Sequence, residues 1–131
     1  MNRYEDGNNL YYIGVRVDGS AIIKKKKNGT YYTLTQIPNI YQGSYNRDNN
    51  PNLLPQNKWI GLRSEIKNIT NNKVEIKLYI DKLWQGNWQL IASTIDDGVS
   101  FGGSALVNSG LNGIRTDFMD VEFRDFKVIK L

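Results

Sequence analysis

Apolar and polar side chains alternate along most of this chain, and this period of two limits its fold more than any other feature. The clearest case is residues 73–81, in which every second side chain is aliphatic: Val74, Ile76, Leu78 and Ile80. Successive side chains of a β-strand point to opposite faces, so the pattern predicts a strand with one buried face. No stretch shows the 3.6-residue period of an amphipathic helix. The sequence therefore predicts an all-β domain.

Turn signals divide this pattern into antiparallel strands. Asp18-Gly19 and Asn28-Gly29 favour two-residue hairpin turns, and Asn71-Asn72 marks another turn. Residues 35–58, punctuated by proline and asparagine, predict a long surface loop or a loop that hides a short strand at residues 40–45. The pattern predicts about eight or nine strands, which include residues 10–17, 21–27, 30–34, 59–69, 73–81, 88–94, 113–117 and 119–129.

The composition narrows the chemistry. The chain has 131 residues, which fits one domain over residues 1–131, and 40% of them are hydrophobic, enough for a core. Cysteine and histidine are both absent, which excludes disulfides, thiolate chemistry, imidazole catalysis and the usual zinc sites. We therefore expect no metal and no cofactor.

The distribution of basic residues indicates which classes of binding partner to expect. The net charge is +4, and the only dense basic run is Lys24 to Lys27. Nucleic-acid surfaces spread basic residues and aromatics over one face, so the pattern disfavours nucleic acid and predicts a solvated, charged edge strand. No apolar run is long enough to cross a membrane, and we expect no membrane insertion. The sequons at Asn28 and Asn68 suit an extracellular or cell-surface location.

Three stretches carry a resemblance: YIGVRVDGSAIIKKK at residues 12–26, WIGLRSEI through KLYID at residues 59–81, and GIRTDFMDVEFRDFKV at residues 113–128. Together they resemble the concanavalin A-like lectin/glucanase superfamily, the laminin-G-like jelly rolls whose closing strand is rich in Asp and Phe. The resemblance implies a two-sheet antiparallel β-sandwich. Members are usually longer, so it also implies a fragment that lacks the first strands.

The resemblance carries two further expectations. A sandwich without some of its strands exposes sheet edges, through which a homodimer could form. Some members bind calcium through an acidic residue in the closing strand, but Arg124 stands where that acid is expected. This argues against a calcium site.

The resemblance also raises two enzyme classes of the superfamily. Its glycosidases resemble one another in a carboxylate cluster spaced Glu-x-Asp-x-x-Glu, which is absent here. Glu65 and Glu75 are instead expected to form ion pairs with Arg63 and Lys77. A polysaccharide lyase needs a base and a cation, a role that Tyr12 with Arg16, or Tyr79 with Arg63, could fill. A polysaccharide-active enzyme therefore stays as an alternative.

A non-catalytic carbohydrate-binding module needs only aromatic planes and a few polar side chains to bind a glycan or polysaccharide. We expect Trp84, Tyr41 and Tyr45 to lie on loops at the rim of such a site, and Trp59 and Trp88 to fill the core. A structural or protein-interaction module is the remaining alternative. The residues predicted to line one concave sheet are Tyr12, Arg16, Arg63, Glu65, Tyr79 and Arg115.

Overall fold

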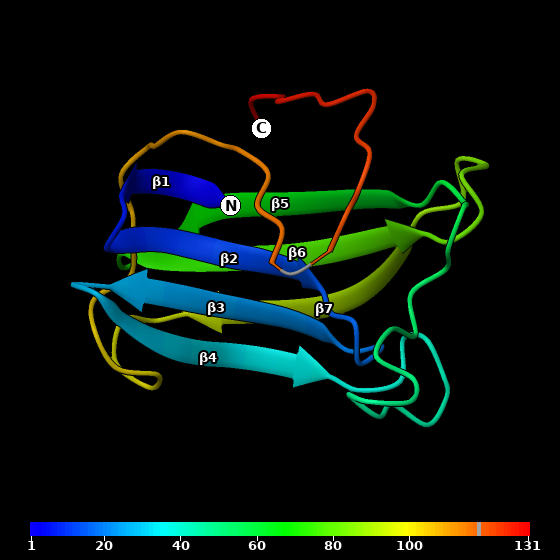
Figure 1. Cartoon of the computed structure of the whole chain (residues 1–131). Coiled ribbons are helices and arrows are strands. Elements are labelled where there is room, and N and C mark those ends of the chain that lie inside the picture. The colour runs from blue at the N-terminus through cyan, green and yellow to red at the C-terminus, as the bar shows by residue number, and fades with distance from the viewer. Residues whose placement is uncertain (118) are drawn as a thin grey trace.

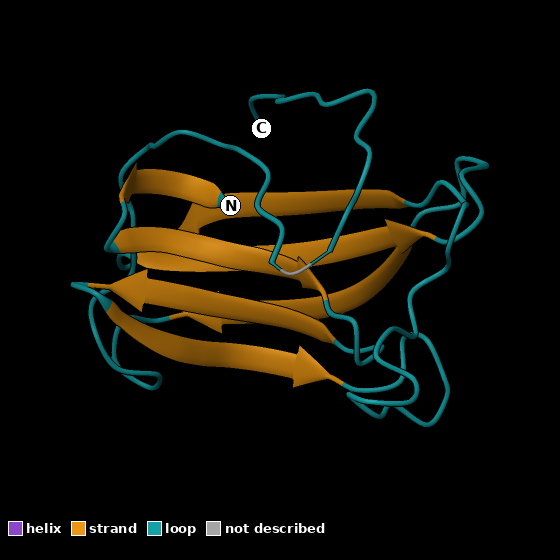
Figure 2. Ribbon diagram, viewed as in Figure 1, coloured by secondary structure: helices purple, strands orange, loops and turns teal. Residues whose placement is uncertain are grey.

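The computed structural model describes residues 1–117 and 119–131, and its regular elements are all strands. Two antiparallel sheets pack against each other as a β-sandwich, which confirms the predicted fold class (Figures 1 and 2). Sheet I has the order β1-β2-β3-β4 and sheet II the order β5-β6-β7. The strands are β1 (Asn2–Asp6), β2 (Asn9–Val15), β3 (Ala21–Lys27), β4 (Thr30–Ile37), β5 (Gly61–Ile69), β6 (Lys73–Asp81) and β7 (Gln89–Asp96).

The core lies between the sheets and is built from the alternating apolar residues. Strand β6 contributes one complete face, because its even-numbered side chains from Val74 to Ile80 are all buried. Sheet I contributes Ile23 and Leu34 among others, and Leu106 packs against both sheets from the segment that follows β7. Residues of the two sheets that are distant in sequence thus share one hydrophobic cluster.

The predicted hairpins form, with a two-residue turn at Asn28-Gly29, but Asp18-Gly19 lies in a longer turn that a hydrogen bond from Arg16 N to Ser20 O closes. Strands β5 and β6 pair without a register shift from Gly61 opposite Asp81 to Ile69 opposite Lys73. Asn71 and Asn72 turn the chain between them with φ angles of 62° and 55°, a left-handed conformation that asparagine tolerates better than most residues. Strand β7 ends at Asp96, two residues beyond the predicted strand at residues 88–94.

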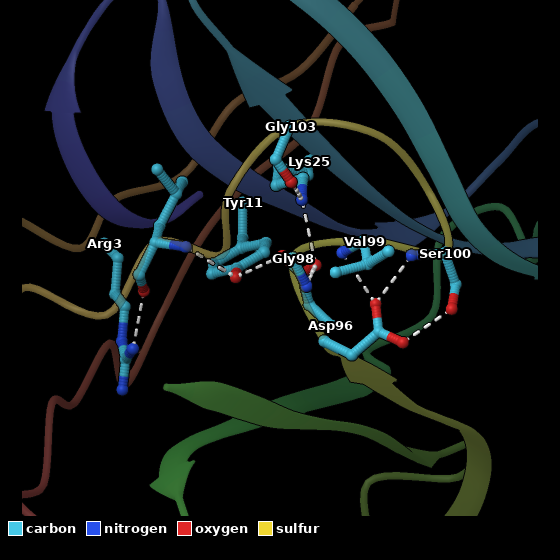
Figure 3. A network of polar contacts seen from close by, with 10 residues as sticks. Arg3, Tyr11, Lys25, Asp96, Gly98, Val99, Ser100 and Gly103 are labelled. Carbon is cyan, nitrogen blue, oxygen red and sulfur yellow. Dashed lines mark hydrogen bonds and ion pairs between the residues drawn. The ribbon is translucent and has the colours of Figure 1, made fainter. Parts of the chain in front are cut away.

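A buried polar network joins the two sheets (Figure 3). Lys25 on β3 and Asp96 on β7 are both fully buried, and the Lys25 Nζ lies 2.8 Å from an Asp96 carboxylate oxygen. The Tyr11 hydroxyl donates to the other Asp96 oxygen at 2.7 Å. Strand β3 lies in the middle of sheet I, so the predicted solvated edge strand is wrong. Burial of a lysine on the core face of a central strand is costly unless an opposite charge faces it, and Asp96 of the other sheet supplies that charge.

The two ends of the chain differ from the prediction. Strand β1 was not predicted, because residues 2–6 are mostly polar and their burial depends on β2. The strands expected at residues 113–117 and 119–129 are absent from the described part of the chain, although Gly113 N donates to Met1 O at 3.0 Å beside an isolated bridge between Tyr4 and Leu111. A strand needs the N–H and C=O groups of a neighbour, which apolar alternation does not supply. The resembling stretch at residues 113–128 also spans Phe118, which lies outside the described residues.

The long connection between β4 and β5 crosses one end of the sandwich (Figure 1). Of the two predicted alternatives the surface loop is correct, because no strand forms at residues 40–45, and Asn46 and Asn50 pair in an isolated bridge. Backbone hydrogen bonds attach the connection to the β2–β3 turn, where Tyr41 N donates to Gly19 O and Leu53 N donates to Val17 O. Within the described residues there is no helix of the length and hydropathy that a membrane span requires.

Candidate functional site

Three of the predicted site residues meet on the outer face of sheet II. Arg63 lies directly opposite Tyr79 in the β5–β6 pairing, and Glu65 is two residues further along β5 on the same face. The Arg63 guanidinium carbon lies 4.9 Å from the centre of the Tyr79 ring and pairs with the Glu65 carboxylate. The Tyr79 hydroxyl donates to the same carboxylate at 3.3 Å. An aromatic ring, a cation and an anion therefore stand in one contiguous group.

Trp88 extends this group along the strand. A methyl group added to Gly61 would come within 2.7 Å of the Trp88 ring, so the ring lies against the backbone of β5 where only glycine leaves room. Gly61 has the same strand parity as Arg63, which places the ring on the outer face of sheet II. Trp88 is 41% exposed, and its predicted place in the core is wrong. We refer to Arg63, Glu65, Tyr79 and Trp88 as the outer-face cluster.

The electrostatics of the cluster keep both charges in place. The hydrogen bond from Arg63 lowers the pKa of Glu65 below its ordinary value, and the same bond raises the pKa of Arg63. The neighbouring pair of Lys77 Nζ and Glu75, 2.9 Å apart, confirms the ion pair expected on this face. The cluster thus presents a permanent carboxylate and a permanent guanidinium to solvent.

The cluster also borders exposed apolar surface. Leu90 on β7 lies directly opposite Tyr79 and is 52% exposed. Leu90, Tyr79 and Arg63 therefore form a row across the three strands of sheet II. Such a row combines an apolar surface with planar polar groups at its end.

The remaining strand-derived candidates lie on the opposite side of the sandwich. Tyr12 is on the outer face of sheet I, where the Arg115 guanidinium carbon lies 5.8 Å from its ring centre and Arg115 donates to the Tyr31 hydroxyl at 3.1 Å. Arg16 pairs with Asp18 at 3.5 Å. The predicted single concave sheet is therefore wrong, because strand parity separates inside from outside but does not assign a strand to a sheet.

Trp84 lies on the β6–β7 loop with a positive φ of 55°. Trp84 is 37% exposed. One guanidinium contacts two rings here, because the Arg124 guanidinium carbon lies 5.4 Å from the centre of the Trp84 ring and 5.3 Å from the centre of the Trp59 ring. Trp59 is 39% exposed, so its predicted core position is also wrong. We refer to Trp59 and Trp84 as the tryptophan pair.

The two tyrosines expected at the rim differ from each other. Tyr45 is exposed, as a rim residue should be. Tyr41 turns inward: its hydroxyl oxygen is buried with no hydrogen-bond partner among the described residues, and burial raises its pKa. Tyr41 therefore offers no free polar edge to a ligand.

The part of the chain that the structure describes gathers no three acidic side chains in a cluster that could hold a metal ion. Comparisons with protein-family models, with curated proteins and with solved structures find no match to this chain. Any function must therefore be argued from the geometry of its own side chains.

Proposed function

We propose that this chain is a non-catalytic carbohydrate-binding module that binds a glycan or polysaccharide with the outer-face cluster. The observation that carries the proposal is the exposed Trp88 ring beside the Arg63–Tyr79–Glu65 group on one sheet face. Aromatic rings provide a flat apolar surface for the C–H faces of sugars. A guanidinium and a carboxylate supply the directional hydrogen bonds that sugar hydroxyls require.

The protonation of the candidates favours binding over bond cleavage. A general acid in glycoside hydrolysis needs a raised carboxyl pKa, whereas Arg63 lowers the pKa of Glu65. A tyrosine base in a lyase needs a lowered pKa, whereas burial raises the pKa of Tyr12. The resemblance to concanavalin A-like domains supports the same proposal and fits an extracellular or cell-surface location.

The test is a retention assay on immobilised neutral and acidic polysaccharides, with the wash fractions read for unsaturated products by ultraviolet absorbance. We expect retention without product. Trp88→Ala and Tyr79→Ala should each weaken binding by about tenfold or more, the usual cost of truncating an aromatic anchor at a binding surface.

The matched control is Tyr31→Ala, which removes an exposed tyrosine from the outer face of sheet I and should leave retention unchanged. Loss of retention in this control but not in Tyr79→Ala would move the site to sheet I. Release of unsaturated product would replace the proposal with a lyase.

A further inference from the structure

A polar groove lies at the opposite end of the sandwich from Trp88. It consists of two adjoining hollows of about 380 Å³ and 560 Å³ that share Glu5 and Asn108 in their walls. Asn71 and Asn72 of the β5–β6 turn line the first hollow, and Tyr4 lines the second. We call the two hollows together the loop-end groove. Both hollows are open to solvent, the second more than the first.

The groove and the outer-face cluster are separate places on the molecule. Trp88 lies against Gly61, the first residue of β5, whereas the groove adjoins the turn that follows Ile69, the last residue. Nine residues of strand separate them, which corresponds to roughly 25 Å at the rise of a β-strand. One small ligand cannot occupy both.

The floor of the groove is held in place by hydrogen bonds from side chains of the sheets. Residues 104–108 line the first hollow without belonging to a strand, and side chains from three strands fix their backbone. The Tyr11 hydroxyl accepts from Leu106 N at 3.1 Å, Arg3 donates to Leu106 O at 2.7 Å, and Asn68 donates to Val107 O at 2.9 Å. Lys25 holds the preceding Gly103 carbonyl at 2.7 Å (Figure 3). A floor tied down in this way is preorganised for a ligand.

The walls, by contrast, carry side chains whose polar groups are unused. Among the described residues, no hydrogen bond or ion pair engages the side chains of Glu5, Lys27, Asn71, Asn72 or Asn108. Asp97 differs, because its carboxylate already accepts from Val99 N and from Ser100. The first hollow thus offers three free amides, one free carboxylate and one free ammonium to the same space.

The chemistry of these groups selects the ligand. Amides both donate and accept, which suits hydroxyl groups that do the same. The free charges of Glu5 and Lys27 are opposite, and Asp97 adds negative charge, so the groove has no excess positive charge to attract an anion. Tyr4 adds an aromatic ring in the second hollow, where a further sugar unit could stack.

We propose that the loop-end groove is a second carbohydrate site, which binds a short neutral oligosaccharide. The proposal rests on the proposed function only in its ligand class, since it uses different residues.

The test is NMR of the full chain titrated with the neutral tetrasaccharides of cellulose, laminarin, starch and mannan. We expect the side-chain amide signals of Asn71, Asn72 and Asn108 and the backbone amide of Gly98 to shift together with one of them. Asn108→Ala should weaken that interaction by about fivefold to tenfold, since it removes one or two hydrogen bonds. Glu5→Gln keeps the shape of the wall and should weaken binding of the oligosaccharide less than Asn108→Ala does.

The matched control is Asn87→Ala, which removes an exposed asparagine from the β6–β7 loop at the other end of the strands and should change nothing. The spectrum of each variant shows directly whether it is folded. Absence of groove shifts with all four sugars overturns the groove site, and so does unchanged affinity in Asn108→Ala. Polysaccharide retention that depends on Trp88 but not on Asn108 would then leave the proposed function standing. Groove shifts without such retention would support the groove site and overturn the proposed function of the outer-face cluster.

Discussion

At the scale of single residues, the most consequential feature is the fully buried pair of Lys25 and Asp96. Each charge is tolerable in the core only because the other compensates it, and Tyr11, Gly98 and the Gly103 carbonyl complete the hydrogen bonds. Burial and the hydrogen bond to Asp96 also raise the pKa of Tyr11. The pair therefore ties β3 to β7 across the sandwich.

Replacing one member of this pair should destabilise the fold strongly. Asp96→Asn keeps the shape and most hydrogen bonds but leaves Lys25 as a buried, uncompensated charge, and we expect it to lower the free energy of unfolding by about 3–5 kcal/mol. Adding Lys25→Met should restore part of this loss. Chemical denaturation of the two single variants and the double variant measures the coupling.

The exposed pair on sheet II is the matched control for this cycle. Glu75→Gln breaks the ion pair with Lys77, which is partly exposed, and should destabilise the fold far less than Asp96→Asn. Equal losses for Asp96→Asn and Glu75→Gln would contradict the role given to burial.

At the scale of elements, the loop after β7 contains a carboxylate that responds to pH. The Ser100 hydroxyl, followed by the backbone N–H groups of Ser100 and Val99, lowers the pKa of Asp97 from 3.8 to about 2. A lowered folded-state pKa stabilises the fold above the ordinary value, and this contribution is lost as the pH falls from about 4 to 2. Ser100→Ala should raise the pKa of Asp97 and flatten that part of the stability curve.

The measurement is an NMR titration of the Asp97 carboxyl together with unfolding curves over the same pH range. Asp97→Asn removes the titrating group, so in that background Ser100→Ala should have the same effect at every pH. A pKa of Asp97 that does not change in Ser100→Ala would contradict the assignment.

The C-terminal segment, residues 119–131, is a second element whose behaviour can be tested. Among the described residues, Arg124 contacts the sandwich through the tryptophan pair. Exposed cation–π contacts contribute about 0.5–1 kcal/mol each, enough to bias a segment toward one position but not to fix it. Arg124→Ala should therefore increase fast backbone motion in residues 119–131 and shift the indole N–H signals of Trp59 and Trp84.

Lys127→Ala is the control for Arg124→Ala, because it removes a cation from the same segment without touching either ring. The indole signal of Trp88 should move in neither variant. Unchanged relaxation of the segment in Arg124→Ala would show that other contacts hold it.

The sequence predicted those elements whose signals are local. The β5–β6 hairpin was predicted because its alternation and its Asn71-Asn72 turn lie within one continuous stretch. Strand β1 was missed, and strands were wrongly expected after residue 112, because pairing depends on a distant neighbour. The burial of Lys25 depends on Asp96, which lies 71 residues away in the sequence.

The candidate site was predicted in part for the same reason. The parity of β5 and β6 correctly grouped Arg63, Glu65 and Tyr79 on one face. It could not reveal that Tyr12 belongs to the other sheet. The place of Trp88 has one signal in the sequence, Gly61, whose missing side chain leaves room for a ring, but nothing local connects the two.

At the scale of the whole molecule, both sheets have open edges and the C-terminal segment exposes apolar side chains. Strand β4 borders sheet I, and β5 and β7 border sheet II, whereas the edge of β1 is partly paired with the backbone of Leu111 and Gly113. The exposed apolar residues of the segment are Val121, Phe123, Phe126, Val128, Ile129 and Leu131. This combination supports the alternative proposal of a homodimer that forms through a sheet edge.

Self-association is tested by light scattering on a sizing column over a range of concentrations. We expect a dimer fraction that rises with concentration and falls in Phe123→Ser and Phe126→Ser. Tyr45→Ser, which removes an exposed aromatic outside the segment, should leave it unchanged. A monomer at every concentration would exclude the dimer.

The placement of the tryptophans has a consequence for spectroscopy. All three lie at the end of the sandwich where β5 begins, two of them around Arg124 and the third against Gly61. Indole emission excited at the red edge of the absorption band therefore reports on that end alone. A sugar that enters the loop-end groove should leave the intrinsic fluorescence unchanged, whereas one that stacks on Trp88 should alter it, so a single optical titration distinguishes which end of the molecule is occupied.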